Sequence, residues 1–218
     1  MSLLQAITAR PWLPDTGIIA QRPSAALAAI EARRFALRVF LAVVSILFLL
    51  LLTAYAGRMA YEDWRPAPQM RLLWANTAVL LLASASLQWA LFGAGRLSAS
   101  AVRAGTLAAV AMTGVFLYGQ LLAWSQLAAM ELVDIRNPAI GFFYLITGLH
   151  GIHLLGGLAV LGRTTWRAFG AFDAEAVRHS LENCVLYWHF LLLVWLVLFG
   201  LLFSGNNFEL LLEICGIR

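Results

Sequence analysis

The sequence has no lysine, only two cysteines and few charged residues of either sign. All fifteen basic residues are arginines, they stand against eleven acids, and charged residues make up 12% of the 218 positions. Hydrophobic residues make up 62%, and the mean hydropathy is +0.82, whereas a soluble domain is about half apolar and about a quarter charged. The scarcity of charge excludes an ordinary soluble domain and indicates a membrane protein, so the net charge of +4 gives no reason to expect a nucleic-acid partner.

Several common functional motifs are also absent. The two cysteines, Cys184 and Cys215, lack metal-ligand spacing, and we expect no disulfide between them. The sequence contains no GxGxxG, no P-loop and no nucleophile elbow. The apolar stretches hold no evident acid beyond Glu182 near one end, whereas a proton-coupled transporter usually has a carboxylate or a broken helix at mid-membrane. Residues 1–34 lack an early apolar stretch, so we expect no cleavable signal.

Five long apolar stretches define the predicted fold. A helix needs about 20 apolar residues to cross a bilayer, and five stretches meet that length. The sequence therefore predicts an all-α, polytopic membrane protein with a five-transmembrane-helix bundle. The predicted spans are residues 35–57, 72–93, 102–127, 138–162 and 181–204, and residues 163–180 are expected to form the longest internal loop.

The distribution of arginine predicts the orientation. With five spans, the side that holds the N-terminus carries ten arginines and the other side carries five. Because cytoplasmic loops are enriched in basic residues, we expect the N-terminus inside and the C-terminus outside. Residues 1–34 are then a cytoplasmic extension, 35–204 the membrane domain and 205–218 a periplasmic tail. Two helix starts are marked by capping signals, Ser24 and the pair Asn137–Pro138.

Three histidines lie inside the last two predicted spans. His150 and His153 belong to the fourth span and His189 to the fifth. Ionisable side chains in hydrocarbon are rare and mark candidate functional sites. At about 100° per residue, the two histidines of the fourth span lie opposite a group of glycines, which predicts a packing seam because glycines let membrane helices approach closely. The seam glycines are Gly141, Gly148, Gly151 and Gly162.

The depth of the histidines leaves three interpretations open. Counted along antiparallel helices, His153 and His189 lie at about the same level of the membrane. They could be axial ligands of a haem held between helices, ligands of another metal, which needs three or four donors, or members of a structural hydrogen-bond network with lipid contacts. Trp188 and Trp195 are seven residues apart on one helix face, a spacing typical of a packing stripe.

The segments around these histidines resemble a known family. FFYLITGLHGIHLLGGL (142–158) followed by YWHFLLLVWLVLF (187–199) resembles the last two helices of cytochrome c oxidase subunit III, with its TGxHGxHxxxG and YWHFxxxxW signatures. FLAVVSILFLLLLTAY (40–55) and FLYGQLLAW (116–124) are similar to two further motifs of that family. The resemblance covers every span except the second, and five spans match the shorter bacterial form.

The sequence departs from the family at three intramembrane acids. The positions where the family has acids are occupied by Val44, Ala123 and Leu192. The resemblance therefore indicates a divergent branch, and functions that depend on those carboxylates do not carry over.

The resemblance implies a non-catalytic subunit of a haem–copper oxidase in the bacterial inner membrane. It implies no cofactor in this chain, haem and copper in the catalytic subunit I, a further partner in subunit II, bound phospholipid, and a role in stability and proton uptake. The alternatives are an accessory subunit of nitric oxide reductase and a haem-binding electron-transfer protein that uses His153 and His189. The expected lipid-binding or helix-packing residues are Gly148, His150, Gly151, His153, Trp188, His189 and Trp195.

Overall fold

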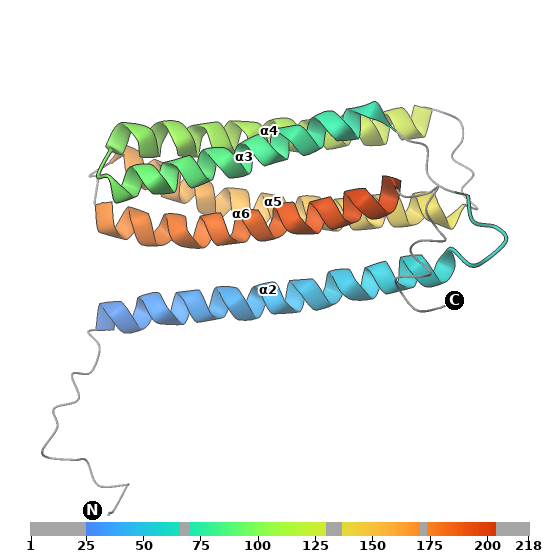
Figure 1. Cartoon of the computed structure of the whole chain (residues 1–218), viewed down its shortest axis with the longest axis horizontal. Coiled ribbons are helices and arrows are strands. Elements are labelled where there is room, and N and C mark those ends of the chain that lie inside the picture. Colours follow the sequence, from blue (N-terminus) through green and yellow to red (C-terminus); the bar gives the residue numbers. More distant parts are fainter. Residues whose placement is uncertain (1–24, 66–69, 130–136, 171–173, 204–218) are drawn as a thin grey trace, which may run out of the picture. The chain divides into compact units, whose positions relative to one another are not determined.

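The computed structural model describes residues 25–65, 70–129, 137–170 and 174–203. Within these ranges all regular structure is helical, and all five helices are long and apolar enough to cross a membrane. The prediction of five membrane-spanning helices is confirmed, and the chain is a multi-pass membrane protein. The helices are α2 (Ala25–Arg58), α3 (Arg71–Gly95), α4 (Ala99–Ala129), α5 (Pro138–Phe169) and α6 (Ala174–Phe203) (Figure 1).

The chain forms two units, Met1–Ala36 and Leu37–Arg218. In the first unit, the described residues 25–36 form the first turns of α2. Ser24, which the sequence marks as a capping residue, lies outside the described residues, as do Cys215 and the predicted tail 205–218. The second unit contains all the other helical residues and every site discussed below.

Four helices of the second unit form a bundle. In it α3 neighbours α4 and α6, and α5 neighbours the same two helices, so the four run side by side in the order α3, α4, α5, α6 (Figure 1). The closest pair is α3 and α4, where small residues meet. A β-carbon added to Gly105 would lie 2.8 Å from both Ala90 Cβ and the Ser86 carbonyl oxygen. Small residues allow this approach because lipid supplies little hydrophobic drive for helices to associate.

The turn between α3 and α4 is only three residues long. Leu97 adopts a left-handed conformation with a φ of 55°, and the Ser98 amide donates back to the Gly93 carbonyl over 2.9 Å. A β-carbon on Gly93 would lie 2.7 Å from Ala101 Cβ. The tight turn therefore needs glycine at position 93. The turn in this way fixes the antiparallel pairing of α3 and α4.

Helix α2 is packed differently from the other four. Within Leu37–Arg218 its contacts with them are mainly between side chains, with Val44, Phe48 and Tyr55 joining Ile146 and Leu198 in one cluster. Leu41 is buried in the core of the bundle, but many other apolar side chains of α2 are exposed, as expected for a helix that faces lipid or a partner protein. The exposed residues include Val39, Phe40, Val43, Ile46, Leu47, Leu49 and Leu50.

The helices extend beyond the predicted spans, and the predicted loop 163–180 is wrong. α5 continues to Phe169 and α6 begins at Ala174. The C-terminal end of α5 is held by the Arg103 guanidinium, whose Nε donates to the Ala168 carbonyl over 2.8 Å. Backbone hydrogen bonding continues where a helix leaves the apolar layer, whereas a hydropathy pattern marks only the apolar part of the helix.

Candidate functional site: the histidines of α5 and α6 and the adjoining pocket

His150 lies in an aromatic enclosure at the centre of the second unit. Its side chain is fully buried, and its ring centroid lies 5.2 Å from that of Trp195, 6.0 Å from Phe116 and 6.5 Å from Phe48. Neither ring nitrogen has a hydrogen-bond partner among the described residues. The imidazole therefore fills space among the aromatic rings of α2, α4 and α6.

His153 lies one turn further along α5 and faces α2. Its ring centroid is 5.7 Å from that of Phe48 and 6.2 Å from that of Phe40. Its Nδ1 lies 2.7 Å from the Leu149 carbonyl oxygen of its own helix, so Nδ1 carries the proton. The Tyr187 hydroxyl of α6 donates to the His153 carbonyl over 2.8 Å. His153 therefore marks the place where α2, α5 and α6 come together.

His189 lies on an exposed face of α6, beside Leu186 and Leu193. Its Nδ1 is 2.7 Å from the Val185 carbonyl oxygen, again within its own helix. Among the described residues, the ring of His189 makes no contact with that of His153. In the same part of the chain, no group of three or more His, Cys, Asp or Glu side chains is placed to hold a metal ion. A haem between two helices needs ligands from facing positions, and these two imidazoles do not provide that arrangement.

Three tryptophans each donate their indole N–H to a threonine on a neighbouring helix. Trp188 of α6 donates to Thr113 of α4 over 3.3 Å, and Trp195 of α6 donates to Thr77 of α3 over 3.0 Å. Trp124 of α4 donates to Thr147 of α5 over 3.1 Å. Each threonine hydroxyl donates in turn to the carbonyl four residues earlier in its own helix. These pairs satisfy buried polar groups and connect the four helices.

The sequence placed Trp188 and Trp195 in a packing stripe but did not identify their partners. Both indoles are about 1% exposed, as a packing stripe requires. Thr113 and Thr77 lie 75 and 118 positions away in the sequence, and threonine is common in apolar helices. No local pattern could have identified the pairing.

The glycines of α5 do not form a continuous seam. Added β-carbons at Gly148 and Gly151 would lie 3.4 Å from the Trp124 ring and 3.9 Å from Leu117, ordinary contacts with α4, whereas Gly141 and Gly162 face open space among the described residues. The close approach occurs at Gly157, on the histidine side of the helix. A β-carbon there would lie 2.5 Å from the Tyr187 ring and 3.0 Å from the Trp188 ring. Within the described residues the predicted seam is therefore formed only at Gly148 and Gly151, and the space that Gly157 leaves is occupied by aromatic rings of α6 and not by a helix backbone.

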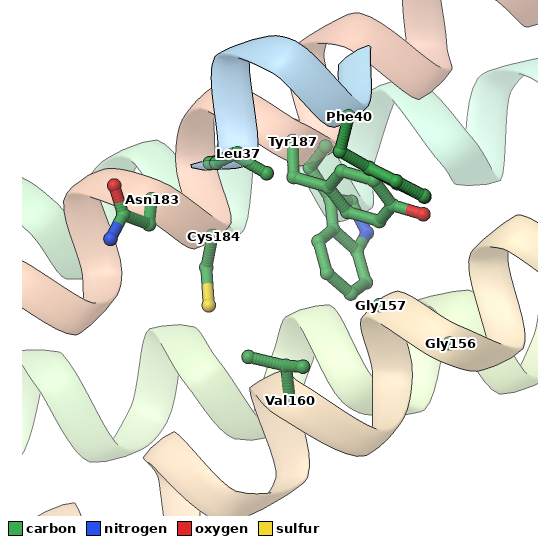
Figure 2. A pocket seen from close by; sticks show the side chains of 9 residues that line it. Leu37, Phe40, Gly156, Gly157, Val160, Asn183, Cys184 and Tyr187 are labelled. Carbon is green, nitrogen blue, oxygen red and sulfur yellow. The ribbon is translucent and has the colours of Figure 1, made fainter. Parts of the chain in front are cut away.

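A pocket of about 390 Å³ lies beside these rings. Figure 2 shows side chains of α2, α5 and α6 around it, with the Cys184 sulfur directed toward Val160. Its walls are almost entirely apolar, with the Asn183 amide as the exception. The lining residues are Leu37, Phe40, Gly156, Gly157, Val160, Asn183, Cys184, Tyr187 and Trp188.

Two arginines follow pocket-lining positions in the sequence, Arg38 on α2 and Arg163 on α5. Arg38 follows the lining residue Leu37, and Arg163 lies three residues after Val160, which is nearly one helical turn. Both side chains are exposed. The pocket therefore combines an apolar cavity with cationic groups toward one end of the helices.

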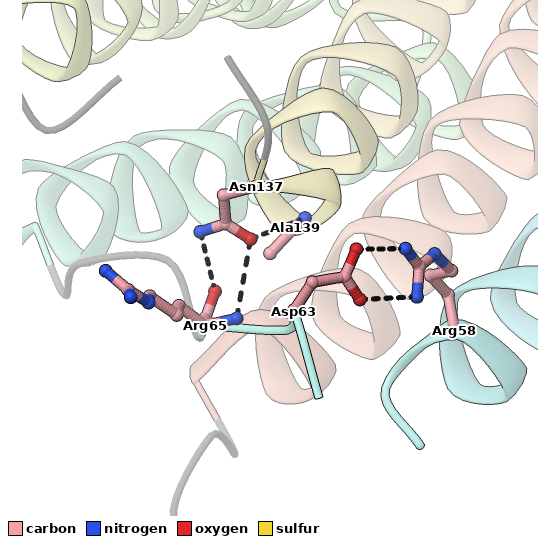
Figure 3. A network of polar contacts seen from close by, with 5 residues as sticks. All are labelled: Arg58, Asp63, Arg65, Asn137 and Ala139. Atoms are coloured by element: carbon pink, nitrogen blue, oxygen red, sulfur yellow. Dashed lines mark hydrogen bonds and ion pairs between the residues drawn. The ribbon is translucent and has the colours of Figure 1, made fainter. Parts of the chain in front are cut away.

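A polar network holds the opposite end of the second unit (Figure 3). The predicted cap is confirmed, since Asn137 Oδ1 accepts the Ala139 amide over 3.1 Å, with proline in the first turn of α5. Asn137 Oδ1 also accepts the Arg65 amide, and its Nδ2 donates to the Arg65 carbonyl over 2.9 Å. Nearby, the Arg58 guanidinium binds both carboxylate oxygens of Asp63, and this hydrogen bonding lowers the pKa of that carboxyl below its usual value.

The three positions that lack the expected acids have apolar surroundings. Val44 is buried in the cluster that contains Phe48 and Ile146. Ala123 is fully buried in the core of the bundle, and Leu192 packs against the same core. Any role of these positions in this chain is therefore one of packing.

Comparison with known proteins agrees with the sequence motifs. The pattern of the family described as Cytochrome c oxidase subunit III matches residues 64–205. The chain is 31% identical over 185 residues to the cytochrome c oxidase subunit 3 of Synechocystis, covering 79% of this chain and 76% of that protein. It is 29% identical over 184 residues to the protein of the same name in Thermostichus vulcanus, covering 82% of this chain and 90% of the relative.

Proposed function

Because the chain belongs to the cytochrome c oxidase subunit III family, we propose that it is the non-catalytic third subunit of a haem–copper terminal oxidase in aerobic respiratory electron transport. In this proposal it lies in the bacterial inner membrane, packs on the catalytic subunit I in a complex that also contains subunit II, and binds phospholipid. The observation that carries the proposal is the family match over most of the membrane helices, joined to an apolar pocket built by the motif residues Gly157, Tyr187 and Trp188.

The pocket fits one acyl chain of a phospholipid. Its volume of about 390 Å³ lies in the range of about 300–1,000 Å³ that holds small ligands. The exposed guanidinium groups of Arg38 and Arg163 are suited to a phosphate group, which arginine can bind with two parallel hydrogen bonds. A chain inserted beside Tyr187 with its phosphate near these arginines would fill the space among α2, α5 and α6.

The redox centres of the complex belong, in this proposal, to subunit I. The donor atoms of this chain support that assignment, since the imidazoles of His153 and His189 do not face each other and each Nδ1 is bonded to its own helix. The apolar surroundings of Val44 and Ala123 mean that support of proton uptake would be indirect. The subunit would act by keeping the catalytic subunit and its lipids in place.

Purification of the chain from its native membrane with an affinity tag tests the proposal. We expect a large partner that carries haem and copper and reduces oxygen, while the chain separated from that partner shows no Soret band. A partner that carries haem without copper and reduces nitric oxide would place the chain in a nitric oxide reductase instead. A Soret band in stoichiometric amount with the separated chain would overturn the non-catalytic assignment.

Filling the pocket tests the lipid assignment. Gly156 lines the pocket, and a β-carbon there meets nothing within 4 Å, so Gly156→Leu should add an apolar side chain to the cavity with room at its β-carbon. We expect the purified complex to retain one phospholipid fewer, measured by native mass spectrometry. Gly141→Leu is the matched control, because Gly141 also faces open space but does not line the pocket. Equal lipid content in the two variants would contradict the assignment.

A further inference from the structure

We propose that the exposed face of α6 around His189 docks onto a transmembrane helix of a partner subunit, and that this helix donates a hydrogen bond to His189 Nε2. The partner is defined by its chemistry, an apolar helix that carries a hydroxyl, amide or indole donor at mid-membrane depth. The inference rests on the proposed function, because it assumes that the chain belongs to a complex, and it identifies the surface through which the chain joins that complex.

The docking face is a regular stripe along α6. Leu186, His189, Leu193 and Val197 follow one another at spacings of three and four residues, which places them on one side of a helix. The three apolar residues are 43%, 60% and 50% exposed, and His189 is exposed as well. The opposite side of α6 holds Trp188 and Trp195, which face the bundle core. The stripe is therefore available to a partner in the part of the chain that the structure describes.

The hydrogen bond within α6 determines what the partner must offer. A carbonyl oxygen can only accept, so the 2.7 Å contact between His189 Nδ1 and Val185 oxygen requires a proton on Nδ1. In the neutral imidazole, Nε2 then carries a lone pair and no proton. Nε2 has no hydrogen bond among the described residues. The unsatisfied group is thus an acceptor, and it calls for a donor.

The depth of His189 decides between lipid and protein as the source of that donor. The span of α6 runs from Glu175 to Leu201, and His189 lies next to its midpoint. The ends of the span are therefore about 21 Å and about 18 Å away at 1.5 Å per residue, and the start of the predicted apolar stretch at Leu181 is about 12 Å away. An imidazole is shorter than any of these distances and cannot reach the headgroups, as long Lys and Arg side chains near helix ends do. Acyl chains offer no donor, so a helix of another protein is the occupant that fits.

Leucine and glutamine variants of the purified complex separate hydrogen bonding from packing. His189→Leu removes the acceptor and keeps an apolar side chain, whereas His189→Gln can place its amide oxygen close to the position of Nε2. We expect His189→Leu to raise the detergent-dissociated fraction about threefold to fifteenfold, the range given by measured interhelical hydrogen bonds in membranes. His189→Gln should dissociate much like the unmodified protein. Equal dissociation of both variants and the unmodified protein would overturn the proposed hydrogen bond.

Photo-crosslinking checks the docking face independently of stability. A benzophenone amino acid at Leu193, next to His189 on the stripe, should form a covalent product with a partner subunit. The same amino acid at Leu145 of α5, which is 54% exposed, serves as the control for another exposed site. Crosslinks from position 193 to lipid alone would overturn the docking face. If the unmodified chain purifies without any partner, the proposed function fails, whereas a partner that is retained but never crosslinks at 193 contradicts only this inference.

Discussion

At the scale of single residues, the indole–threonine pairs are the most specific polar contacts in the bundle. Thr113→Val keeps the shape of the side chain but leaves the buried Trp188 N–H without an acceptor. We expect the unfolding free energy to fall by about 1 kcal/mol, because interhelical hydrogen bonds in membranes contribute about 0.6 kcal/mol on average and up to about 1.7 kcal/mol, and an unpaired buried donor adds to the loss. Denaturation in mixed detergent micelles, followed by circular dichroism, measures the change.

Thr113→Ser is the control for this pair, since it keeps the hydroxyl. Trp188→Phe removes the donor, and the double variant with Thr113→Val completes a mutant cycle. A coupling energy indistinguishable from zero would show that the contact contributes only through packing.

Adjacent glycines of α5 give a second test at this scale. Gly157→Ala would place a β-carbon 2.5 Å from the Tyr187 ring, whereas Gly156→Ala meets nothing within 4 Å. We expect Gly157→Ala to lower the unfolding free energy by about 1–3 kcal/mol, the usual effect of overpacking, and to shift the Tyr187 ring away from α5. Gly156→Ala should not destabilise the chain. Thermal unfolding in detergent compares the two, and equal melting temperatures would mean that the Tyr187 ring moves freely.

At the scale of helices and loops, Asn137 connects the start of α5 to the segment that follows α2. Its side chain accepts from Ala139 and both donates to and accepts from the backbone of Arg65. We expect Asn137→Ala to cost about 1 kcal/mol through loss of the cap, and to speed amide exchange at Arg65 as well as in the first turn of α5. Hydrogen exchange with mass spectrometry reports on both segments.

The aspartate variant separates the two roles of Asn137. Asn137→Asp keeps an oxygen that accepts the Ala139 amide but places a carboxylate oxygen, in place of the Nδ2 donor, against the Arg65 carbonyl. Repulsion between these two oxygens should move the Arg65 backbone away and break the contact of its amide as well. Exchange at the start of α5 should stay slow while exchange at Arg65 rises. If both segments exchange as in the unmodified chain, the link between them is not formed in solution.

The sequence predicted the number and the centres of the helices more accurately than their ends. Apolar length alone predicts five spans, and the Asn137–Pro138 pair predicts the start of α5, because both signals are local. The end of α5 at Phe169 depends on Arg103, which lies 65 residues away and caps the helix. The glycines of α5 show the same dependence on residues far away in the sequence. In the described part of the chain, Gly157 meets the rings of Tyr187 and Trp188 and Gly162 meets nothing, a difference that the sequence of α5 alone does not contain.

At the scale of the whole unit Leu37–Arg218, the three histidines have different surroundings that no spacing rule could assign. His150 is enclosed by aromatic rings, His153 faces α2, and His189 is exposed. The two motifs that contain them were recognisable because the residues of each motif are close together in the sequence. The role of each imidazole, however, depends on the helix that it faces. His153 contacts two rings of the loosely packed α2, Phe40 and Phe48, whereas of these two His150 contacts only Phe48. Substitution of His153 therefore tests how the packing of α2 affects the unit as a whole.

We expect His153→Ala to weaken the assembled oxidase without changing its initial rate by more than about twofold. The substitution removes the ring contacts with Phe40 and Phe48 but touches none of the indole–threonine pairs, so the four-helix bundle should persist while α2 loosens. Oxygen consumption should then decline faster during turnover, and more of the subunit should dissociate on dilution into detergent. Ile152→Ala, an adjacent exposed position, should retain the unmodified lifetime. An immediate and complete loss of oxygen reduction in a fully assembled His153→Ala complex would instead assign the imidazole a direct part in the reaction.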